Sequence, residues 1–407
     1  NGMLTHNRTI HMRCDDTVVR IVAGGEQLFR RSRGYAPEPI SLVYDLTEPI
    51  LACGGHLKNT FCLGKGRRAF VSHHIGDLEN LETLTSFREG IEHFQRLFAI
   101  SPTVVAYDLH PGYLATQYAL DLPISQKIGV QHHHAHIASV LAEHGLIEPV
   151  IGIAADGTGY GTDGTIWGGE VLVANLAGFE RSLYLRPVPL PGGEQAVRQP
   201  WRMAAVYLAQ TFGKAFLELD IPFVRQLDHS RWNTLAQMVA RGINSPQTSS
   251  LGRLFDAVAA LIDLRNEVIY EGQAAIALEV LACQASEEAA RQCYPFEING
   301  QMDVTPMLRA MVSDIQQDVP PSHIARRFHH SIAELLATAC LLVREQTGLQ
   351  TVVLSGGVFQ NRLLLERLVW RLQQMAFHVY LNRRVPPNDG GLSFGQLAVA
   401  NARLRKV

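Results

Sequence analysis

The stretch Val150–Gly164, VIGIAADGTGYGTDG, begins as a continuous apolar run and ends in a glycine- and hydroxyl-rich tip. Residues 166–175 are strand-like again, so the pattern predicts two strands joined by a glycine turn. Comparable turns follow strand-like segments at Gly54-Gly55 and Gly356-Gly357. Such glycines let backbone N–H groups approach phosphates closely, and the last turn leads into a predicted helix, whose N-terminus attracts anions. Together the three turns indicate a nucleotide held between two lobes.

The length of 407 residues exceeds what one hydrophobic core usually supports, so at least two lobes are expected. With 36 basic and 38 acidic residues the charges nearly cancel, which argues against nucleic acid or an anionic membrane surface as a partner. Six dispersed cysteines form no C-x-x-C pair and are expected to be reduced thiols. No apolar run approaches the length of about 20 residues needed to cross a bilayer. The composition therefore predicts a cytoplasmic protein.

The chain alternates between strand-like and helical patterns, which indicates an α/β fold. Residues 16–32 resemble a β-hairpin, prolines follow at 37 and 39, and a new strand pattern begins at residue 40. Apolar residues recur every three or four positions from 81 to 98, as in an amphipathic helix. Residues 195–348 are mainly helical in pattern.

The densest cluster of chemically active side chains is His132, His133, His134 and His136, at the start of a predicted helix. His132 and His136 are four residues apart, so a helix places both imidazoles on one face, one turn apart, where they can share a metal ion. Histidines at a helix start can instead cap or solvate it, but four within this short stretch favour the metal. His133 and His134 should point elsewhere.

Two imidazoles leave most of a coordination sphere open, and Asp156 and Asp389 stand beside glycines where strands are expected to end. Mixed histidine and carboxylate ligation suits Fe or Zn better than Mg, and open positions would let the metal act as a Lewis acid. Either aspartate could instead belong to an Asx turn. The motif G-x-x-x-x-G-K-S/T is absent, which excludes a P-loop NTPase, and a zincin protease is unsupported because H-E-x-x-H is absent.

The motifs around these residues resemble those of a known superfamily. One branch of the actin-like ATPase superfamily includes the TsaD tRNA threonylcarbamoyltransferases and the antibiotic O-carbamoyltransferases. The metal and nucleotide motifs of that branch resemble, in order and spacing, four stretches of this chain: His132-x-x-x-His136, Asp156–Gly159, Leu354–Asn361 and Asn388–Gly390. The match covers roughly residues 40–407. Within that branch, five stretches resemble the HypF family specifically: Leu57–Leu63, His110–Tyr113, Val130–His136, Pro200–Ala204 and Tyr270–Ala275.

The resemblance implies a two-lobed actin-like ATPase (ASKHA) fold with a small β fragment at the N-terminus. Residues 38–407 are expected to form a Kae-like carbamoyltransferase domain, with lobes at about 38–175 and 176–407. The stretch from Thr5 to Asp16 is similar to the end of the HypF YrdC-like domain, so residues 1–37 are expected to be its C-terminal remnant. The family's acylphosphatase domain and zinc-finger region have no counterpart in this sequence.

The resemblance also implies roles for individual residues. His132, His136, Asp156 and Asp389 would hold Fe or Zn and position a phosphoryl or carbamoyl oxygen. The catalytic candidates are His132, His136 and Lys58. The lysine could neutralise phosphate charge, although a lysine in a hairpin can simply be solvated. The implied nucleotide-binding residues are Gly192, Gly193, Glu271, Gly356, Gly357 and Asn361. Among these, Glu271 could equally be a helix-surface residue.

The activity implied by the resemblance is carbamoyl transfer. Carbamoyl adenylate, made from carbamoyl phosphate and ATP with Mg, would donate its carbamoyl group to the C-terminal cysteine thiol of a HypE-like acceptor, for the cyanide ligands of NiFe hydrogenase. One alternative is an ATP-dependent kinase or chaperone-like ATPase of the same fold, which would need Mg and no histidine pair. The other is a docking module that binds a partner without catalysis.

Overall fold

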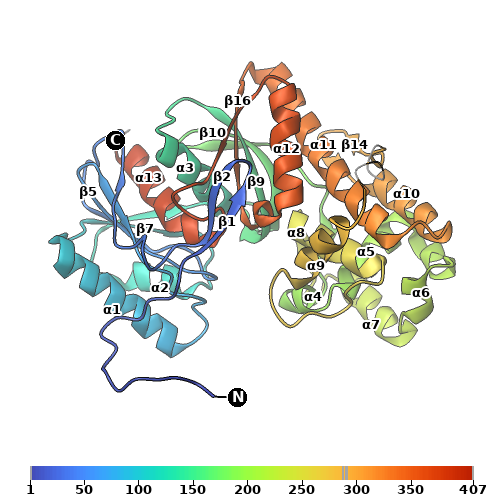
Figure 1. Ribbon diagram of the computed structural model, residues 1–407, viewed down its shortest axis with the longest axis horizontal. Helices are drawn as coiled ribbons and strands as arrows, with labels where there is room; N and C mark the ends of the chain where they lie inside the picture. The colour runs from blue at the N-terminus through green and yellow to red at the C-terminus, as the bar shows by residue number, and fades with distance from the viewer. Residues whose placement is uncertain (1, 287, 289–291, 406–407) are drawn as a thin grey trace.

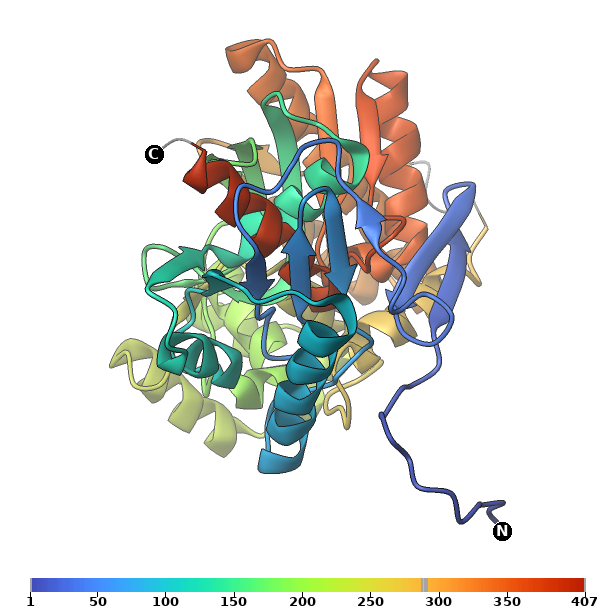
Figure 2. The same cartoon turned by 90° about the vertical axis from the view of Figure 1, so that its left-hand side faces the viewer.

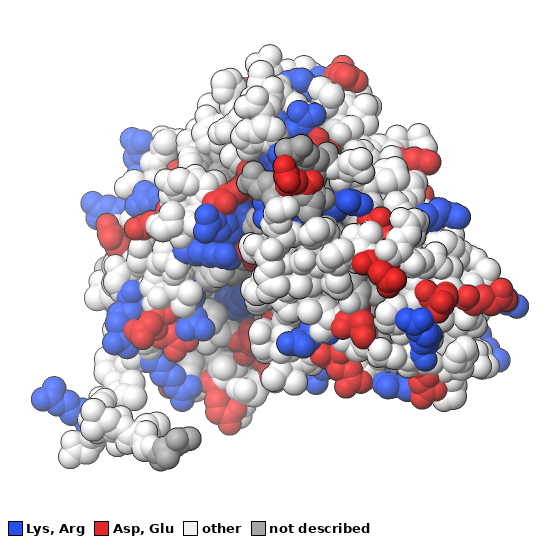
Figure 3. Space-filling view, turned by 45° about the vertical axis from the view of Figure 1, so that its right-hand side comes forward, with Lys and Arg blue, Asp and Glu red and all other residues white. Residues whose placement is uncertain are grey.

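The computed structural model describes residues 2–286, 288 and 292–405. Two β-sheets form the centres of two lobes, and a large group of helices extends from the second one (Figures 1 and 2). None of the helices within these described ranges has the length and apolar character needed to span a bilayer. On the face in Figure 3, basic and acidic side chains lie interspersed, in keeping with the balanced composition.

The first sheet has six strands and carries two helices on its outer face. Its order is β3 (Ile40–Ser41), β6 (Arg68–Val71), β5 (Cys62–Lys65), β4 (Ile50–Ala52), β7 (Val104–Asp108) and β8 (Gln126–Val130). The outer helices are α1 (Leu81–Phe98) and α2 (Leu114–Asp121). The side chain of Asn80 caps α1 by accepting the N–H of Thr83, and Phe87, Ile91 and Phe94 are buried against the sheet. The helix predicted at 81–98 is confirmed.

The second sheet has seven strands and contains the predicted glycine-rich hairpin. Its order is β12 (Val188–Pro189), β13 (Gln247–Thr248), β10 (Ile166–Ala174), β9 (Val150–Tyr160), β16 (Thr351–Ser355) and β17 (His378–Leu381), with β11 (Phe179–Tyr184) also paired to β10. Strands β9 and β10 are antiparallel, which confirms the hairpin. Strand β16 runs parallel to β9, with Ser355 opposite Ala154, so the Gly356-Gly357 turn lies beside Asp156.

Two helices pack against each other between the sheets. Helix α3 (His132–His144) contacts β9 and β16, whereas α13 (Leu392–Leu404) contacts β4 and β5. They approach so closely that a Cβ on Gly395 would lie 1.9 Å from the carbonyl oxygen of Ala135. Because α3 is enclosed on all sides, every residue from His132 to Ala142 is buried. Its histidines are therefore interior groups and not a solvated helix end.

The region from residue 194 to 374 supplies the helical part of the second lobe, as predicted for 195–348. Its core is one apolar cluster centred on helices α5, α8 and α11. The helices are α4 (Glu194–Arg198), α5 (Trp201–Phe212), η1 (Gly213–Glu218), α6 (Pro222–Gln226), α7 (His229–Ala240), α8 (Leu251–Leu261), α9 (Gln273–Ala282), α10 (Thr305–Gln316), α11 (Pro321–Thr347), η3 (Gly357–Gln360) and α12 (Arg362–Gln374). A small pair of strands joins them, β14 (Glu297–Ile298) and β15 (Met302–Asp303).

The N-terminal hairpin, β1 (Val18–Val22) and β2 (Gly25–Arg30), packs onto the rest of the fold. The guanidinium of Arg383 donates to the carbonyl oxygens of Val22 and Glu26, each at 3.0 Å. The side-chain amide of Asn388 donates to the carbonyl oxygen of Phe29 at 3.0 Å. Residues 18–30 are thus fixed against the C-terminal part of the chain, beside Asp389.

The expected division into lobes at about residue 175 differs from the sheet membership. Strands β9 and β10 precede residue 175 but pair with β16 and β11 in the second sheet. Helix α13, at the end of the chain, packs on the first sheet. The predicted boundary follows chain order, whereas strands β9 and β10 join the second sheet and the closing helix returns to the first.

Candidate functional site

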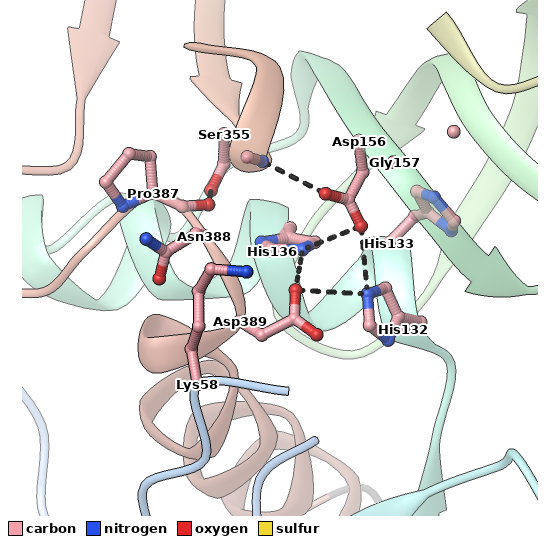
Figure 4. Close-up of polar contacts among 12 residues, drawn as sticks. Lys58, His132, His133, His136, Asp156, Gly157, Ser355, Pro387, Asn388 and Asp389 are labelled. Carbon is pink, nitrogen blue, oxygen red and sulfur yellow. Dashed lines mark hydrogen bonds and ion pairs between the residues drawn. The ribbon is translucent and has the colours of Figure 1, made fainter. Parts of the chain in front are cut away.

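Four side chains from separate elements point toward one centre between the sheets (Figure 4). His132 and His136 lie one turn apart on α3, Asp156 lies on β9, and Asp389 begins η4 (Asp389–Gly391), immediately before α13. Their ligand atoms all lie within 4.8 Å of one another. Sequence reasoning placed Asp156 at the end of a strand; instead β9 continues to Tyr160, and the aspartate lies where pairing with β16 ceases. All four residues predicted as metal ligands are brought together.

The geometry of this cluster fits a metal ion. Nε2 of His132 lies 3.3 Å from Asp156 Oδ2 and 3.8 Å from Asp389 Oδ1, and Nε2 of His136 lies 3.7 Å from each. Both ring nitrogens of His136 are buried without a hydrogen-bond partner in the described part of the chain. Leaving such atoms unsatisfied is costly, and a cation at the centre would bind Nε2 and balance two carboxylates. Two imidazoles and two carboxylates suit a transition metal.

A further residue, the buried Asp108, orients one of the histidines. Nδ1 of His132 lies 2.8 Å from Oδ2 of Asp108, at the end of β7, so Nε2 is directed to the centre. This is the carboxylate–histidine arrangement that fixes the tautomer of metal-binding imidazoles. Burial alone would lower the pKa of His132, but Asp108 and Asp389 raise it well above its usual value. Sequence reasoning missed Asp108, although it follows a buried strand and precedes the HypF-like stretch His110–Tyr113.

The carboxyl group of Asp156 is held ionised. Burial alone would raise its pKa, but its contacts with His132 and His136 lower the pKa well below the usual value. The backbone N–H of Gly357 donates to Asp156 Oδ1 at 3.1 Å. This N–H was expected to face a phosphate, so its use here corrects that expectation. Gly356 has φ 111°, and a Cβ there would lie 2.1 Å from the carbonyl oxygen of Ala155, so the turn requires glycine.

The other two histidines at the start of α3, His133 and His134, face away from the centre, as predicted. His133 Nδ1 contacts the side-chain amide of Gln131 at 3.2 Å, and His134 Nε2 contacts the carbonyl oxygen of Asn175 at 2.7 Å. Burial lowers the pKa of both rings, so both are neutral. Their positions support the predicted separation of ligand and structural histidines.

A cavity of about 290 Å³ opens beside the cluster and shares Asp156 and Asp389 with it. Its walls come from β9, the α8–α9 region, the turn after β16, and Arg20 and Phe29 of the N-terminal hairpin. Of the residues predicted to bind nucleotide, Glu271, Gly357 and Asn361 line it. The predicted nucleotide site and metal site are therefore adjacent.

Lys58 and Glu271 meet at the mouth of this cavity. The ammonium group of Lys58 contacts a carboxylate oxygen of Glu271, and the Lys58 backbone N–H donates to Asp77. Burial alone would lower the pKa of Lys58, but Glu271 and then Asp389 raise it. The lysine is thus a charged group that links the two lobes next to the cluster, and Glu271 is more than a surface residue of a helix.

Asn361 is both a cavity residue and a structural one. Its Oδ1 accepts the N–H of Leu364 at 3.0 Å and caps α12, and its Nδ2 contacts Nε2 of the buried His329 at 2.9 Å. Burial lowers the pKa of His329 to about 4, so its neutral ring accepts this hydrogen bond while Nδ1 donates to Ala325. The sequence predicted that Asn361 faces a ligand and matters little for fold stability. These two contacts show that it also stabilises the fold.

Gly192 and Gly193 do not join the first cavity. Gly193 lines a second cavity of about 340 Å³ on the other side of the β9–β10 tip. Gly192 donates its N–H to the carbonyl oxygen of Asn244, and a Cβ on it would lie 2.7 Å from a guanidinium nitrogen of Arg202. Their predicted contact with adenosine stays a prediction, and β9 lies between them and the first cavity.

Two charged pairs in the first cavity escaped the sequence analysis. Arg253 and Asp256 on α8 form an almost fully buried ion pair at 2.7 Å, and burial raises the pKa of Asp256. Arg20 of β1 lies 3.1 Å from Glu279 of α9, whose side chain is 9% exposed. Buried charges within the otherwise apolar run of α8 were the available signal, since such groups rarely occur without a role.

Comparisons with known proteins agree with this architecture. The family described as "HypF Kae1-like domain" matches residues 45–143, and "Carbamoyltransferase, Kae1-like Domain, second subdomain" matches residues 152–396. A crystal structure of full-length HypF in the phosphate- and nucleotide-bound form superposes with a TM-score of 0.92 at 46% identity, covering 98% of this chain and 62% of that one. The predicted two-lobed α/β fold is confirmed.

Curated relatives carry the same name. Carbamoyltransferase HypF of Synechocystis sp. is 42% identical over 98% of this chain and 53% of its own length. The carbamoyltransferase HypF homolog of Cupriavidus necator is 37% identical over 86% of this chain and 91% of its own length. The chain thus spans about half the length of the first of these relatives and nearly all of the second. It belongs to the HypF family of carbamoyltransferases.

Proposed function

We propose that this chain transfers a carbamoyl group from carbamoyl adenylate to the C-terminal cysteine thiol of a HypE-like acceptor, for the cyanide ligands of NiFe hydrogenase. The observation that carries the proposal is that Asp156 and Asp389 belong both to a metal-type cluster and to the lining of the adjacent cavity. An acyl phosphate bound there would have its anhydride next to the cluster. The nucleotide-bound state of the related full-length HypF supports a nucleotide as the occupant.

The cavity has two chemically different ends. Near the cluster, Lys58 and the backbone of Gly157 would receive the phosphate, because a cation and close backbone approach suit an anion. At the far end, Phe255, Ala275 and Ile276 form an apolar wall that suits a purine base. We infer that adenosine lies toward α8 and α9, and that the carbamoyl group lies toward Asp156.

The transfer requires one bond to form and one to break. The thiol sulfur bonds to the carbamoyl carbon, the bond from that carbon to the phosphate oxygen breaks with its electron pair on AMP, and the thiol proton passes to solvent. When bound, Fe or Zn would supply Lewis-acid polarisation of the carbamoyl oxygen. Lys58 would offset charge on the departing phosphate, and Asp108 would hold His132 in the orientation that the cluster needs.

Mass spectrometry of the acceptor's C-terminal peptide tests this function. With preformed carbamoyl adenylate, we expect the wild-type chain to add one carbamoyl group to the terminal cysteine. Asp389→Asn should slow the transfer roughly 10- to 100-fold or more, because it disturbs the cluster directly. Asp121→Asn, an exposed change at the end of α2, is the matched control and should have no effect. Absence of acceptor carbamoylation by the wild-type chain would favour the docking-module alternative.

A second feeding regime tests the division of labour within the family. The resemblance assigns synthesis of carbamoyl adenylate to a YrdC-like domain, and residues 1–37 resemble the end of such a domain. Supplied with ATP, Mg and carbamoyl phosphate instead of the intermediate, this chain should therefore not modify the acceptor. Carbamoylation under that regime would show that the chain makes its own intermediate.

A further inference from the structure

The segment of residues 382–388 runs from the end of β17 to Asp389. Strand β17 is parallel to β16, with Leu381 opposite Leu354, so Asn382 lies beside Ser355 at the carboxyl ends of the two strands. The Ser355 hydroxyl donates to Oδ1 of Asn382 at 2.8 Å, and both residues are almost fully buried. The segment that leads to Asp389 is therefore tied, at its first residue, to the strand that ends in the Gly356-Gly357 turn.

The same asparagine is joined to the helix that carries the two histidines of the cluster. Nδ2 of Asn382 donates to the hydroxyl oxygen of Ser139 at 2.9 Å, and that hydroxyl donates to the carbonyl oxygen of His136 at 2.7 Å. Because a serine hydroxyl has one proton, which here goes to His136, its oxygen is left to accept from Asn382. The buried amide of Asn382 thus connects β16 to the backbone of a cluster residue on α3.

This contact belongs to a stripe of polar side chains along one face of α3. The stripe is spaced by four, three and four residues, as one helix face requires, and consists of His132, His136, Ser139 and Glu143. At its last turn, Oε1 of Glu143 accepts the backbone N–H groups of Arg383 and Arg384 at 2.7 and 2.8 Å. One face of α3 therefore carries two ligands of the cluster at its first turns and holds the segment before Asp389 at its later turns.

The far end of the segment is tied to the turn after β16. The backbone N–H of Gly356 donates to the carbonyl oxygen of Pro387 at 2.8 Å, and the next N–H, that of Gly357, donates to Asp156. Figure 4 shows Ser355 and Pro387 together beside the cluster. A displacement of residues 382–388 would therefore move Asp389 directly and would disturb Asp156 through the turn.

We propose that Asn382 is a positioning residue of the metal-type cluster. Through Ser355 and Ser139 it fixes the relative places of the three segments that determine the cluster: the turn that binds Asp156, helix α3, and the segment before Asp389. Asn382 is neither one of the four cluster residues nor part of the described lining of the first cavity, so it acts on geometry and not on a substrate. The inference rests on the metal site of the proposed function and is independent of the carbamoyl chemistry.

Metal affinity, measured without any substrate, tests the proposal. In a Zn²⁺ competition with a chelating indicator, Asn382→Ala should bind about 10- to 100-fold more weakly than the wild type. The matched control is Asn401→Ala, toward the other end of α13 from Asp389. Asn401 is equally buried, accepts the N–H of Thr47 at 2.9 Å and donates to the carbonyl oxygen of Asp45 at 3.3 Å.

Both variants remove a buried amide with two hydrogen-bond partners, so both should unfold at lower urea concentration. Only Asn382→Ala should lose Zn²⁺ affinity, and Asn401→Ala should stay within about twofold of the wild type. Wild-type affinity in a folded Asn382→Ala protein would overturn the assignment. An equal loss of affinity in both variants would also overturn it, because general destabilisation would then be the cause.

Co²⁺ in place of Zn²⁺ reports the geometry of the site. The visible absorption bands of bound Co²⁺ should shift in Asn382→Ala and should match the wild type in Asn401→Ala. If Asn382→Ala does not fold, Ser139→Ala breaks only the link to α3 and should weaken Zn²⁺ binding about threefold or more; unchanged affinity there would overturn the assignment. A wild type that binds Zn²⁺ and transfers nothing, with affinity lost in Asn382→Ala, supports the role of Asn382 and counts against the carbamoyl chemistry. Transfer by the wild type, with Zn²⁺ affinity unchanged in Asn382→Ala, does the reverse.

Discussion

Replacing Asn361 by alanine should destabilise the fold as well as the ligand site. The substitution removes the cap of α12, because Oδ1 no longer accepts the N–H of Leu364, at a cost of about 1 kcal/mol. It also leaves Nε2 of the buried His329 without its donor, which costs roughly 1–3 kcal/mol. Together the free energy of unfolding should fall by about 2–4 kcal/mol.

Urea unfolding followed by circular dichroism, without nucleotide, measures this loss. Asn361→Ser keeps a capping oxygen and loses only the contact with His329, so it should fall between the wild type and Asn361→Ala. Gln360→Ala is the control, since Gln360 lines the same cavity and its side chain makes no hydrogen bond within the described residues. If Asn361→Ala were as stable as Gln360→Ala, the two contacts would not carry the energy assigned to them. Nucleotide affinity should fall about three- to tenfold in the same variant.

Other predictions follow from single contacts. His136→Ala should lose the bound metal while His134→Ala keeps it, as measured by elemental analysis; metal retained in both would refute the cluster. Arg20→Gln should weaken nucleotide binding about tenfold by calorimetry, whereas the exposed Arg33→Gln should not, and equal affinities would remove the hairpin from the site. Burial raises the pKa of Glu143 to about 7. The protonated carboxyl therefore contributes fully to the free energy of unfolding below its usual pKa, and this contribution is lost as pH rises through about 7. Glu143→Gln should flatten that decline in urea midpoints, and an unchanged slope would contradict it.

The sequence predicted the cluster because its spacing has few interpretations. Two histidines four residues apart on a helix must share a face, whatever the rest of the fold does. Aspartates beside glycine turns are ambiguous alone, and the resemblance to the actin-like ATPase branch selected Asp156 and Asp389. Local geometry together with a family motif was therefore enough to identify the four residues of this cluster.

The errors have a different physical origin. Whether the Gly357 N–H faces a phosphate or Asp156 depends on the pairing of β9 with β16, strands some 200 residues apart in the chain. The contact of Asn361 with His329 likewise joins α12 to α11 through the interior. Neither partner is visible in a local pattern, because a periodicity shows which face is buried and not what it meets.

Asp108 shows the same limit on the functional side. An aspartate at the end of a strand is common, and only the parallel alignment of β7 and β8 brings it under the start of α3, which follows β8 directly. Its hydrogen bond to His132 then fixes the ring that faces the cluster. A buried acid after a strand and just before a family-like stretch was the available clue, and it needed the three-dimensional neighbour to acquire meaning.

The source of each ligand couples the cluster to the arrangement of the lobes. His132, His136 and Asp156 come from α3 and β9, which pack together on the second sheet, whereas Asp389 precedes α13, which packs on the first. A metal bound by all four would therefore join the two lobes at their contact. Lys58 and Glu271 make a second link between the lobes at the cavity mouth. Of these two links only the second is exposed to solvent, so its ion pair contributes little to holding the lobes together.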